Sequence, residues 1–141
     1  LDELSIEEFL ARFPAGEYEF EGKTIDGIEL ESTAIFSHAV PAAPTDLSVA
    51  MMGSDLVISW MPAMGPAAGF PNEPIIIVSY QVVVDGGDPS RRFDVTVPAT
   101  ATQVTVPPEY LQPDTEYEFE VLAIEASGNQ TITEGEPFMV P

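Results

Sequence analysis

Glutamates at alternating positions are the residues of this sequence whose spacing most readily suggests chemistry. They form two clusters, one of Glu19, Glu21, Glu29 and Glu31 near the N-terminus, and one of Glu116, Glu118 and Glu120 in the last third of the chain. Alternate side chains point to the same side of a β-strand, so each cluster predicts a row of carboxylates on one strand face. Calcium prefers about six to eight oxygens, including carbonyls from a curved loop, and a flat strand supplies poor geometry for it. We therefore expect no cofactor, with a Ca²⁺ site as the alternative that these carboxylates leave open.

Catalytic groups are sparse. A hydrolase or transferase needs a nucleophile, a base and a group that orients the base, yet His38 is the single histidine and the chain has no cysteine. His38 shares the parity of Phe36 and Val40 at the end of a predicted strand, which favours a structural histidine. The sequence contains no Gly-rich phosphate loop, His-Glu-x-x-His helix or Asp-rich calcium loop. Paired carboxylates are expected on exposed strand faces rather than in the walled cleft that a glycosidase requires. We predict that the chain is not an enzyme.

The charge balance excludes two classes of partner. Twenty-four acidic residues against four basic ones give a net charge of -20, which repels phosphate backbones and anionic lipid surfaces. Nucleic acid is therefore not expected as a partner, and no apolar run approaches the roughly 20 residues of a membrane span. Three interpretations of the excess acid remain: a solvated surface that keeps the protein soluble, an adaptation to high salt, and sites for Ca²⁺ or a cationic partner.

The sequence opens with a predicted short helix. Ser5 and Glu8 have the spacing of a capping box, in which each side chain accepts from the backbone N–H of the other residue. Leu4 and Phe9 have the spacing of a hydrophobic staple, and Pro14 stops the helix. A helix of this length does not persist alone, so it must pack against something.

From Glu17 the apolar period changes to two, which predicts a β-hairpin. Tyr18 and Phe20 share a face with the even-numbered apolar residues of the second strand, namely Ile28, Leu30, Ala34 and Phe36. A two-residue turn at Asp26-Gly27 would break this match, because it sets Tyr18 opposite Ile35. We therefore predict a five-residue loop, 23–27, which sets Phe20 opposite Leu30 and Tyr18 opposite Ser32.

This register has an electrostatic consequence. It places Glu19 opposite Glu31 and Glu21 opposite Glu29, and like charges in such positions repel each other. We consequently take these four glutamates as a candidate binding surface for a cation or a basic partner, against the simpler interpretation of a solvated face.

Two prolines, Pro41 and Pro44, mark the expected internal boundary, because they interrupt a strand ladder. After them, alternating apolar runs predict seven short strands separated by Gly-, Pro- and Asn-rich turns. The runs are Leu47 and Val49; Leu56, Ile58 and Trp60; Ile76, Val78, Tyr80, Val82 and Val84; Phe93, Val95 and Val97; Val104 and Val106; Tyr117, Phe119, Val121 and Ala123; and Phe138 with Val140. Seven strands at this spacing predict an all-β antiparallel sandwich.

Residues 44–141 resemble a fibronectin type III domain, and the marks follow the order of that family. They are Pro44 with Leu47 and Val49, the segment Leu56-Val57-Ile58-Ser59-Trp60, the segment Tyr80-Gln81-Val82, and the segment from Leu111 to Ala123 around Tyr117. The resemblance implies a seven-stranded immunoglobulin-like sandwich without a disulfide. It further implies that Trp60 packs between the sheets, and that the hydroxyl of Tyr117 bonds backbone near residues 111–114. Both aromatic residues are expected to be core residues without a role in binding.

Two segments depart from the family pattern. The loop 61–74 is longer than an ordinary sandwich connection, and its Met61, Met64 and Phe70 are a second candidate binding surface, although a loop folded over the end of the sandwich is the alternative. The extension 1–40 is not required by the family. We expect its helix and hairpin to pack on the domain at 44–141 and to cover an exposed edge or face of the sandwich with Leu4, Phe9, Phe13, Tyr18 and Phe20. The Arg-Gly-Asp tripeptide through which some family members bind integrins is absent.

These observations predict a noncatalytic binding, adhesion or spacer module of a secreted, periplasmic or cell-surface protein. Its partner is expected to be protein or carbohydrate, and its state monomeric or weakly oligomeric. Two alternatives stay open: a structural assembly subunit that pairs through the N-terminal hairpin, and an accessory domain of a larger polysaccharide-acting enzyme. Because the sequence begins at Leu1 without Met and shows no leader pattern, we expect a processed chain. Asn129-Gln130-Thr131 matches a glycosylation sequon, which matters only in a eukaryotic secretory context.

Overall fold

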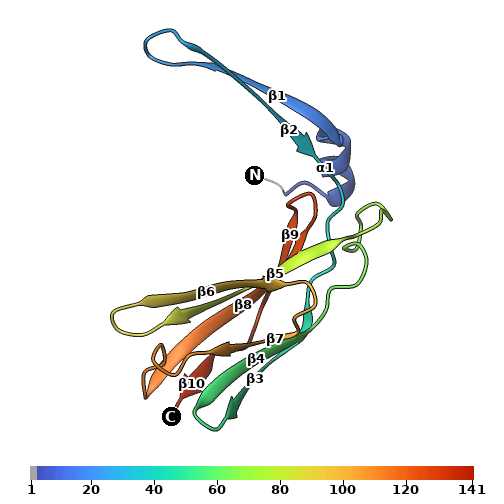
Figure 1. Ribbon diagram of the computed structural model, residues 1–141. Coiled ribbons are helices and arrows are strands. Elements are labelled where there is room, and N and C mark those ends of the chain that lie inside the picture. Colours follow the sequence, from blue (N-terminus) through green and yellow to red (C-terminus); the bar gives the residue numbers. More distant parts are fainter. Residues whose placement is uncertain (1–2) are drawn as a thin grey trace.

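The strands that follow Pro44 form two antiparallel sheets around one core. The computed structural model describes residues 3–141 (Figure 1). The smaller sheet has the order β3-β4-β7, and the larger has the order β10-β8-β5-β6 with β9 also paired to β8. The strands are β3 (Thr45–Met52), β4 (Asp55–Met61), β5 (Ile77–Gly86), β6 (Arg91–Pro98), β7 (Gln103–Val106), β8 (Thr115–Glu125), β9 (Gln130–Glu134) and β10 (Phe138–Val140). The predicted all-β sandwich is confirmed.

The last predicted run, Phe138 and Val140, matches β10, and β9 is an additional strand that no predicted run covers. β9 and β10 both pair with β8, and the register shifts by one residue between the pairs Glu120–Glu134 and Tyr117–Phe138. Gly135 lies at this break and donates its N–H to Phe119, and a Cβ on Gly135 would lie 2.0 Å from the Phe119 ring. A glycine is therefore required where the last strand changes register along β8.

The core contains the two aromatic residues that the sequence singled out. Trp60 and Tyr117 are 3% and 1% exposed, and the ring of Trp60 lies 5.4 Å from that of Tyr80. The Tyr117 hydroxyl accepts a hydrogen bond from the backbone N–H of Gln112 at 2.8 Å, which closes the turn before β8. The predicted tyrosine corner is confirmed.

One strand differs from its predicted pattern. Ile76 and Val78 were expected to share the core face of Tyr80, but they are 61% and 49% exposed. The register between β5 and β8 shifts between Ile77 and Ser79, so Ile77 turns toward the core in their place. A bulge in the strand thus overrides the simple alternation of the sequence.

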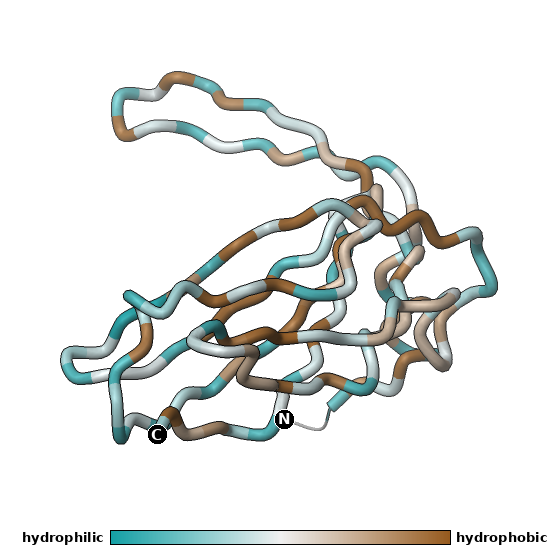
Figure 2. Tube along the Cα trace, turned by 60° about the horizontal axis from the view of Figure 1, so that its bottom comes forward, coloured by the Kyte–Doolittle hydropathy of each residue, from teal (hydrophilic) through white to brown (hydrophobic). Residues whose placement is uncertain are grey.

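The N-terminal extension consists of α1 (Ile6–Arg12), β1 (Gly16–Lys23) and β2 (Glu29–Phe36), which we call the arm. Ser5 caps α1 through the predicted capping box. β1 and β2 pair only with each other, and the hairpin extends away from the sandwich (Figure 1). The hairpin does not pack on the sandwich as expected. Its rows of alternating hydrophobic and hydrophilic residues (Figure 2) lie against neither sheet.

The hairpin register differs from the prediction by two residues on the second strand. Phe20 lies opposite Ser32 and Tyr18 opposite Ala34, so the predicted apolar face is kept but the predicted pairs are wrong. The reason lies in the turn, where Thr24 donates its N–H to Ile28 and its hydroxyl accepts from the Ile28 N–H. Gly27 follows with a φ of 80°, which gives a three-residue loop ending in a left-handed glycine.

Side chains of Asn129 and of β9, which follows it, tie the arm to the sandwich through the linker, residues 37–44. The amide of Asn129 donates to the carbonyls of Ser37 and Ala39 at 2.9 and 3.1 Å. The hydroxyls of Thr131 and Thr133 donate to two further linker carbonyls, those of Pro41 and Pro44, each at 2.6 Å. Every second residue from Asn129 to Thr133 thus bonds the linker, although prolines prevent the linker from forming a regular ladder. The sequon asparagine is part of this attachment.

Candidate functional site

The loop 61–74 also bonds the linker. The Gly65 carbonyl accepts from the Ala42 N–H, and the Ala67 N–H donates to Val40, both at 2.9 Å. At the start of the loop, the Ala63 N–H donates to the buried Tyr80 hydroxyl at 2.9 Å. The loop is thereby fixed between the core and the linker rather than free in solvent.

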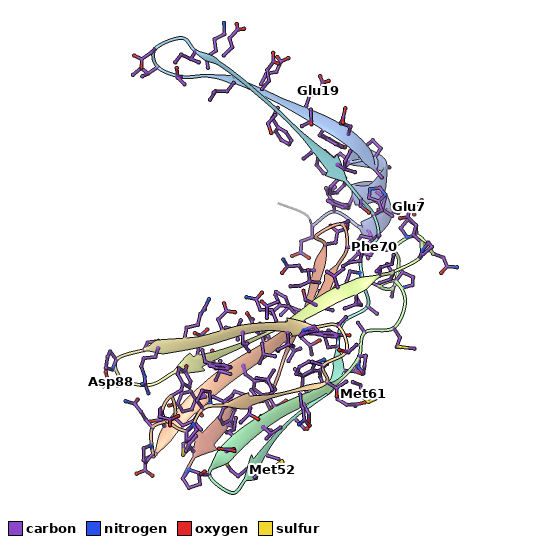
Figure 3. All side chains as sticks on the ribbon, in the orientation of Figure 1. Glu7, Glu19, Met52, Met61, Phe70 and Asp88 are labelled. Carbon is purple, nitrogen blue, oxygen red and sulfur yellow. The ribbon has the colours of Figure 1, made fainter. Side chains whose placement is uncertain are left out.

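The candidate residues of this loop do not form one surface. Met61 and Met64 are 55% and 82% exposed, whereas Phe70 is half-buried and lies beside the base of the arm, away from Met61 (Figure 3). Next to Phe70, a Cβ on Gly69 would lie 2.9 Å from the Ile6 side chain. This end of the loop therefore packs against α1, which favours a packing role for it over a binding role.

An aromatic cluster joins α1 to the hairpin. Phe36 lies at its centre, with its ring 6.2 Å from Phe9, 5.8 Å from Tyr18 and 5.4 Å from His38. His38 is buried, and its Nε2 lies 2.7 Å from the Phe13 carbonyl oxygen, where a protonated Nε2 donates to it. His38 thus has a structural position, as the sequence indicated, and it fixes the end of α1 to the linker.

This cluster borders an apolar groove of about 290 Å³ on the arm. Its lining residues come from α1 and from both strands of the hairpin, and are Phe9, Phe13, Tyr18, Phe20, Ala34, Ile35 and Phe36. Phe20 is 57% exposed, and Leu30, farther along the same face, is 56% exposed. Aromatic and aliphatic residues so exposed in one place are unusual on a protein surface and mark a site of contact.

The other face of the hairpin carries the four candidate glutamates, but they do not pair as predicted. Glu19 lies opposite Thr33, and Glu29 lies opposite Lys23, with which it forms an ion pair at 3.0 Å. Glu21 and Glu31 face each other and are the single like-charge pair between the two strands. Figure 3 shows Glu19 on the side of the hairpin that faces away from the sandwich. The arm is therefore apolar on one face and acidic on the other.

The second glutamate cluster lies on the outer face of the larger sheet. Glu118 and Glu120 line a hollow of about 240 Å³ together with Asp85 and Glu134. Arg92 forms an ion pair with Asp85 at 2.7 Å, and this hydrogen-bonded contact raises the pKa of the Arg92 guanidinium. Within residues 3–141, no group of three or more histidine, aspartate or glutamate side chains has an arrangement that could hold a metal ion.

A buried carboxylate was missed by the sequence reasoning. Glu125 ends β8 and is 4% exposed. It accepts the Ser127 N–H at 2.6 Å and the Ile76 N–H at 3.4 Å. Burial alone raises the pKa of Glu125, but these hydrogen bonds outweigh it and hold the pKa below its ordinary value. Its position fixes the turn after β8, and the sequence signal was a glutamate with the parity of the core residues Val121 and Ala123.

The structure thus brings together a set of residues that the sequence placed elsewhere. Phe9, Phe13, Tyr18 and Phe20 were expected to bury against the sandwich, and instead they line the apolar groove. The sequence signal for this groove was that the apolar residues of both hairpin strands share one face. A hairpin that faces the edge of a sheet does not need a separate apolar face.

Comparison with known proteins decides the family. The model of the fibronectin type III domain matches residues 42–138. The chain belongs to the fibronectin type III family. This match covers the sandwich and part of the linker and leaves the arm outside it. Fibronectin type III domains commonly serve as noncatalytic modules of extracellular and cell-surface proteins.

Solved structures agree with this fold. A myokine structure shares 24% identity with a TM-score of 0.51, and the alignment covers 72% of this chain and 98% of that one. The third fibronectin III domain of the human KIAA0343 protein shares 16% identity with a TM-score of 0.56, over 74% of this chain and 86% of that one. The FN1–FN3 domains of chicken CNTN1 share 19% identity with a TM-score of 0.54, over 90% of this chain and 43% of that one. No curated protein matches the sequence. Residues 3–141 of this fibronectin type III protein contain no helix with the length and hydropathy of a membrane span.

Proposed function

We propose that this chain is a noncatalytic module of a secreted or cell-surface protein, and that it contacts another protein through the arm. The single observation that carries this proposal is the uncovered apolar groove on an arm that stands off the sandwich. The family supports a contact or adhesion role, because its members are commonly modules of that kind.

The energetics of the arm favour a partner. An isolated two-stranded hairpin is at best marginally stable in water, and a third strand or a covering element is what gives such a hairpin independent stability. Here the hairpin contacts α1 at its base through Phe36, but its outer half, including Leu30, lies exposed. A partner on the apolar face would remove this surface from water.

Protein is favoured over carbohydrate as the ligand. The groove is lined by aromatic and aliphatic side chains, and the Tyr18 hydroxyl is already bonded to the Pro14 carbonyl at 2.9 Å. A sugar presents many hydroxyls that need hydrogen-bonding partners when they are buried. An apolar side chain of another protein makes no such demand.

A photoreactive amino acid placed at Leu30 tests the proposal in the cells that produce the protein. We expect a cross-link to one defined protein, whose mass is not that of a second copy of this chain. The matched control carries the same amino acid at Thr96, which is exposed on β6 of the sandwich, and is expected to give no such product. Equal products from both positions would contradict the proposal, and a product of twice the chain's mass would favour the assembly alternative.

Secretion or surface exposure is tested separately. We expect the protein outside the cytoplasm when those cells are fractionated, and accessible to protease added to intact cells. Recovery only with the cytoplasmic fraction would contradict this part of the proposal and would leave the contact surface unaffected.

A further inference from the structure

The outer edge of β1 is an unpaired strand edge. Thr24 donates its N–H to Ile28 at the end of the hairpin, and hydrogen-bonded pairs alternate along an antiparallel ladder. The even-numbered residues of β1 therefore bond β2, and the backbone groups of Glu17, Glu19 and Glu21 point outward. In the described chain, no backbone hydrogen bond from another segment reaches these three residues. They offer both donors and acceptors to an additional strand.

The side chains along this edge alternate in chemistry. Tyr18 and Phe20 project to the apolar face, where they line the groove, whereas Glu17, Glu19 and Glu21 project to the opposite face. The ion pairs within residues 3–141 are Lys23–Glu29 and Arg92–Asp85, so all three glutamates lack a basic partner. A third strand beside β1 would therefore meet aromatic rings on one side and unneutralised carboxylates on the other.

The outer edge of β2 offers less. Its apolar face has the small Ser32 and Ala34 opposite Phe20 and Tyr18, with Leu30 and Phe36 only at its two ends. Of its outward-pointing residues, Glu29 is paired with Lys23, Glu31 is unpaired, and Thr33 and Ile35 are uncharged. Contacts between neighbouring strands depend on large apolar pairs and opposite charges. The β1 edge has two aromatic residues at successive alternate positions and three unpaired glutamates, against one unpaired glutamate on β2, so we assign the docking site to β1.

A second copy of this chain is a poor occupant. Its β1 edge would bring three more glutamates beside Glu17, Glu19 and Glu21, and each chain carries a net charge of -20. Like charges on adjacent strands are destabilising, and acidic residues on an edge are a common means of preventing self-association. The same carboxylates attract a strand that carries basic residues in register.

We propose that β1 accepts an extended segment of a partner protein as a third strand, and that this segment alternates apolar residues with lysine or arginine. Its apolar side chains lie beside Tyr18 and Phe20, and its basic side chains lie beside the three glutamates. Backbone hydrogen bonds to the free edge supply affinity for any strand, and the alternation supplies selectivity. This inference rests on the proposed function, since it names the kind of partner that the arm contacts.

Two peptides of identical composition test the proposal on the complete chain. One is a capped ten-residue peptide that alternates lysine with valine, and the other contains the same residues with the valines in the helical order i, i+3, i+4, i+7, i+8. Binding is followed by NMR titration, and amide exchange is measured on the bound chain. We expect the alternating peptide to bind at least about tenfold more tightly and to slow exchange of the Glu17, Glu19 and Glu21 amides. Equal affinity of the two peptides would show charge attraction alone and would overturn the proposal.

Backbone variants identify the edge. Glu19→Pro removes an outward-pointing N–H and no hydrogen bond to β2, and we expect it to weaken binding of the alternating peptide at least about tenfold. Thr33→Pro makes the same change on the β2 edge and serves as the matched control, with an expected change below twofold. The opposite ranking would overturn the assignment to β1. If Glu19→Pro unfolds the hairpin, the triple variant Glu17→Lys, Glu19→Lys, Glu21→Lys keeps the backbone, and retained binding by it would also contradict the proposal.

The outcome separates this inference from the proposed function. If Leu30 cross-links to a protein but the alternating peptide does not bind selectively, the strand-addition proposal is contradicted and the proposed contact function is not. Loss of the cross-link in Glu19→Pro but not in Thr33→Pro supports both. A concentration-dependent dimer that Glu19→Pro abolishes would show that a second copy occupies the edge, and it would overturn the proposed partner.

Discussion

Individual polar side chains fix the turn after β8 and the linker of this domain. Glu125 is buried at the end of β8, where it receives the backbone N–H groups of Ser127 and Ile76. Asn129, only four residues later, bonds two linker carbonyls. One short stretch of sequence therefore closes the turn after β8 and begins the attachment of the arm.

Glu125 makes stability depend on pH. Because hydrogen bonds hold its pKa below the ordinary value of 4.5 in the folded protein, its contribution is fully present above that value and is lost as pH falls through the folded pKa. We expect Glu125→Gln to lower the free energy of unfolding by about 1.5 to 3 kcal/mol at pH 7, the usual range for hydrogen bonds to a charged group. Urea unfolding across the acid range measures this difference, which shrinks as pH falls. Glu136→Gln at an exposed position is the control, and an equal effect in both variants would contradict the assignment.

At the scale of elements, the alternation of β9 is what couples the arm to the sandwich. Thr131 and Thr133 each donate to a proline carbonyl of the linker. Valine has the same shape as threonine without the donor, and it leaves those carbonyls unpaired. The double variant Thr131→Val, Thr133→Val is therefore expected to lower the free energy of unfolding by about 1 to 3 kcal/mol and to expose the linker.

Limited proteolysis and amide exchange across residues 37–44 check this prediction. We expect faster cleavage and faster exchange in the double variant, while the core strands β5 and β8 keep their protection. Thr96→Val, on exposed β6, is the matched control. Unchanged exchange in the linker would show that the two hydroxyl contacts do not hold it.

The elements differ in how far the sequence could predict them. The capping box of α1, the sandwich strands and the apolar face of the hairpin depend on local spacing, and they are confirmed. The hairpin register was mispredicted because Asp26-Gly27 is compatible with several loop lengths, and the side chain of Thr24 selects among them. The bulge at Ile77 and the course of the arm depend on contacts distant in sequence, and residue alternation carries no information about these.

For the molecule as a whole, charge is the dominant long-range property. With a net charge of -20, repulsion opposes the compact state and is screened by salt. We expect the melting temperature to rise between low and moderate NaCl, and to rise no further when micromolar CaCl₂ is added at constant ionic strength. Scanning calorimetry measures both. Stabilisation by micromolar Ca²⁺ would show a specific calcium site and would contradict a general screening effect.

The sandwich and the arm have separate roles in this protein. The sandwich supplies the core around Trp60 and Tyr117, and the arm supplies an apolar face that the rest of the chain does not cover. The candidate site of this protein is thus outside the segment that defines its family, which is residues 42–138.

Thermal unfolding of the double variant Phe20→Ser, Leu30→Ser tests this claim most directly. Because both side chains are more than half exposed, we expect a melting temperature within about 2 °C of the unmodified chain, since small changes in stability move the midpoint by only a few degrees. Val82→Ser, at a fully buried position of the core, is expected to lower it by more than about 10 °C. A fall of comparable size in the Phe20, Leu30 variant would show that the sandwich covers these residues, and it would contradict an arm free to contact a partner.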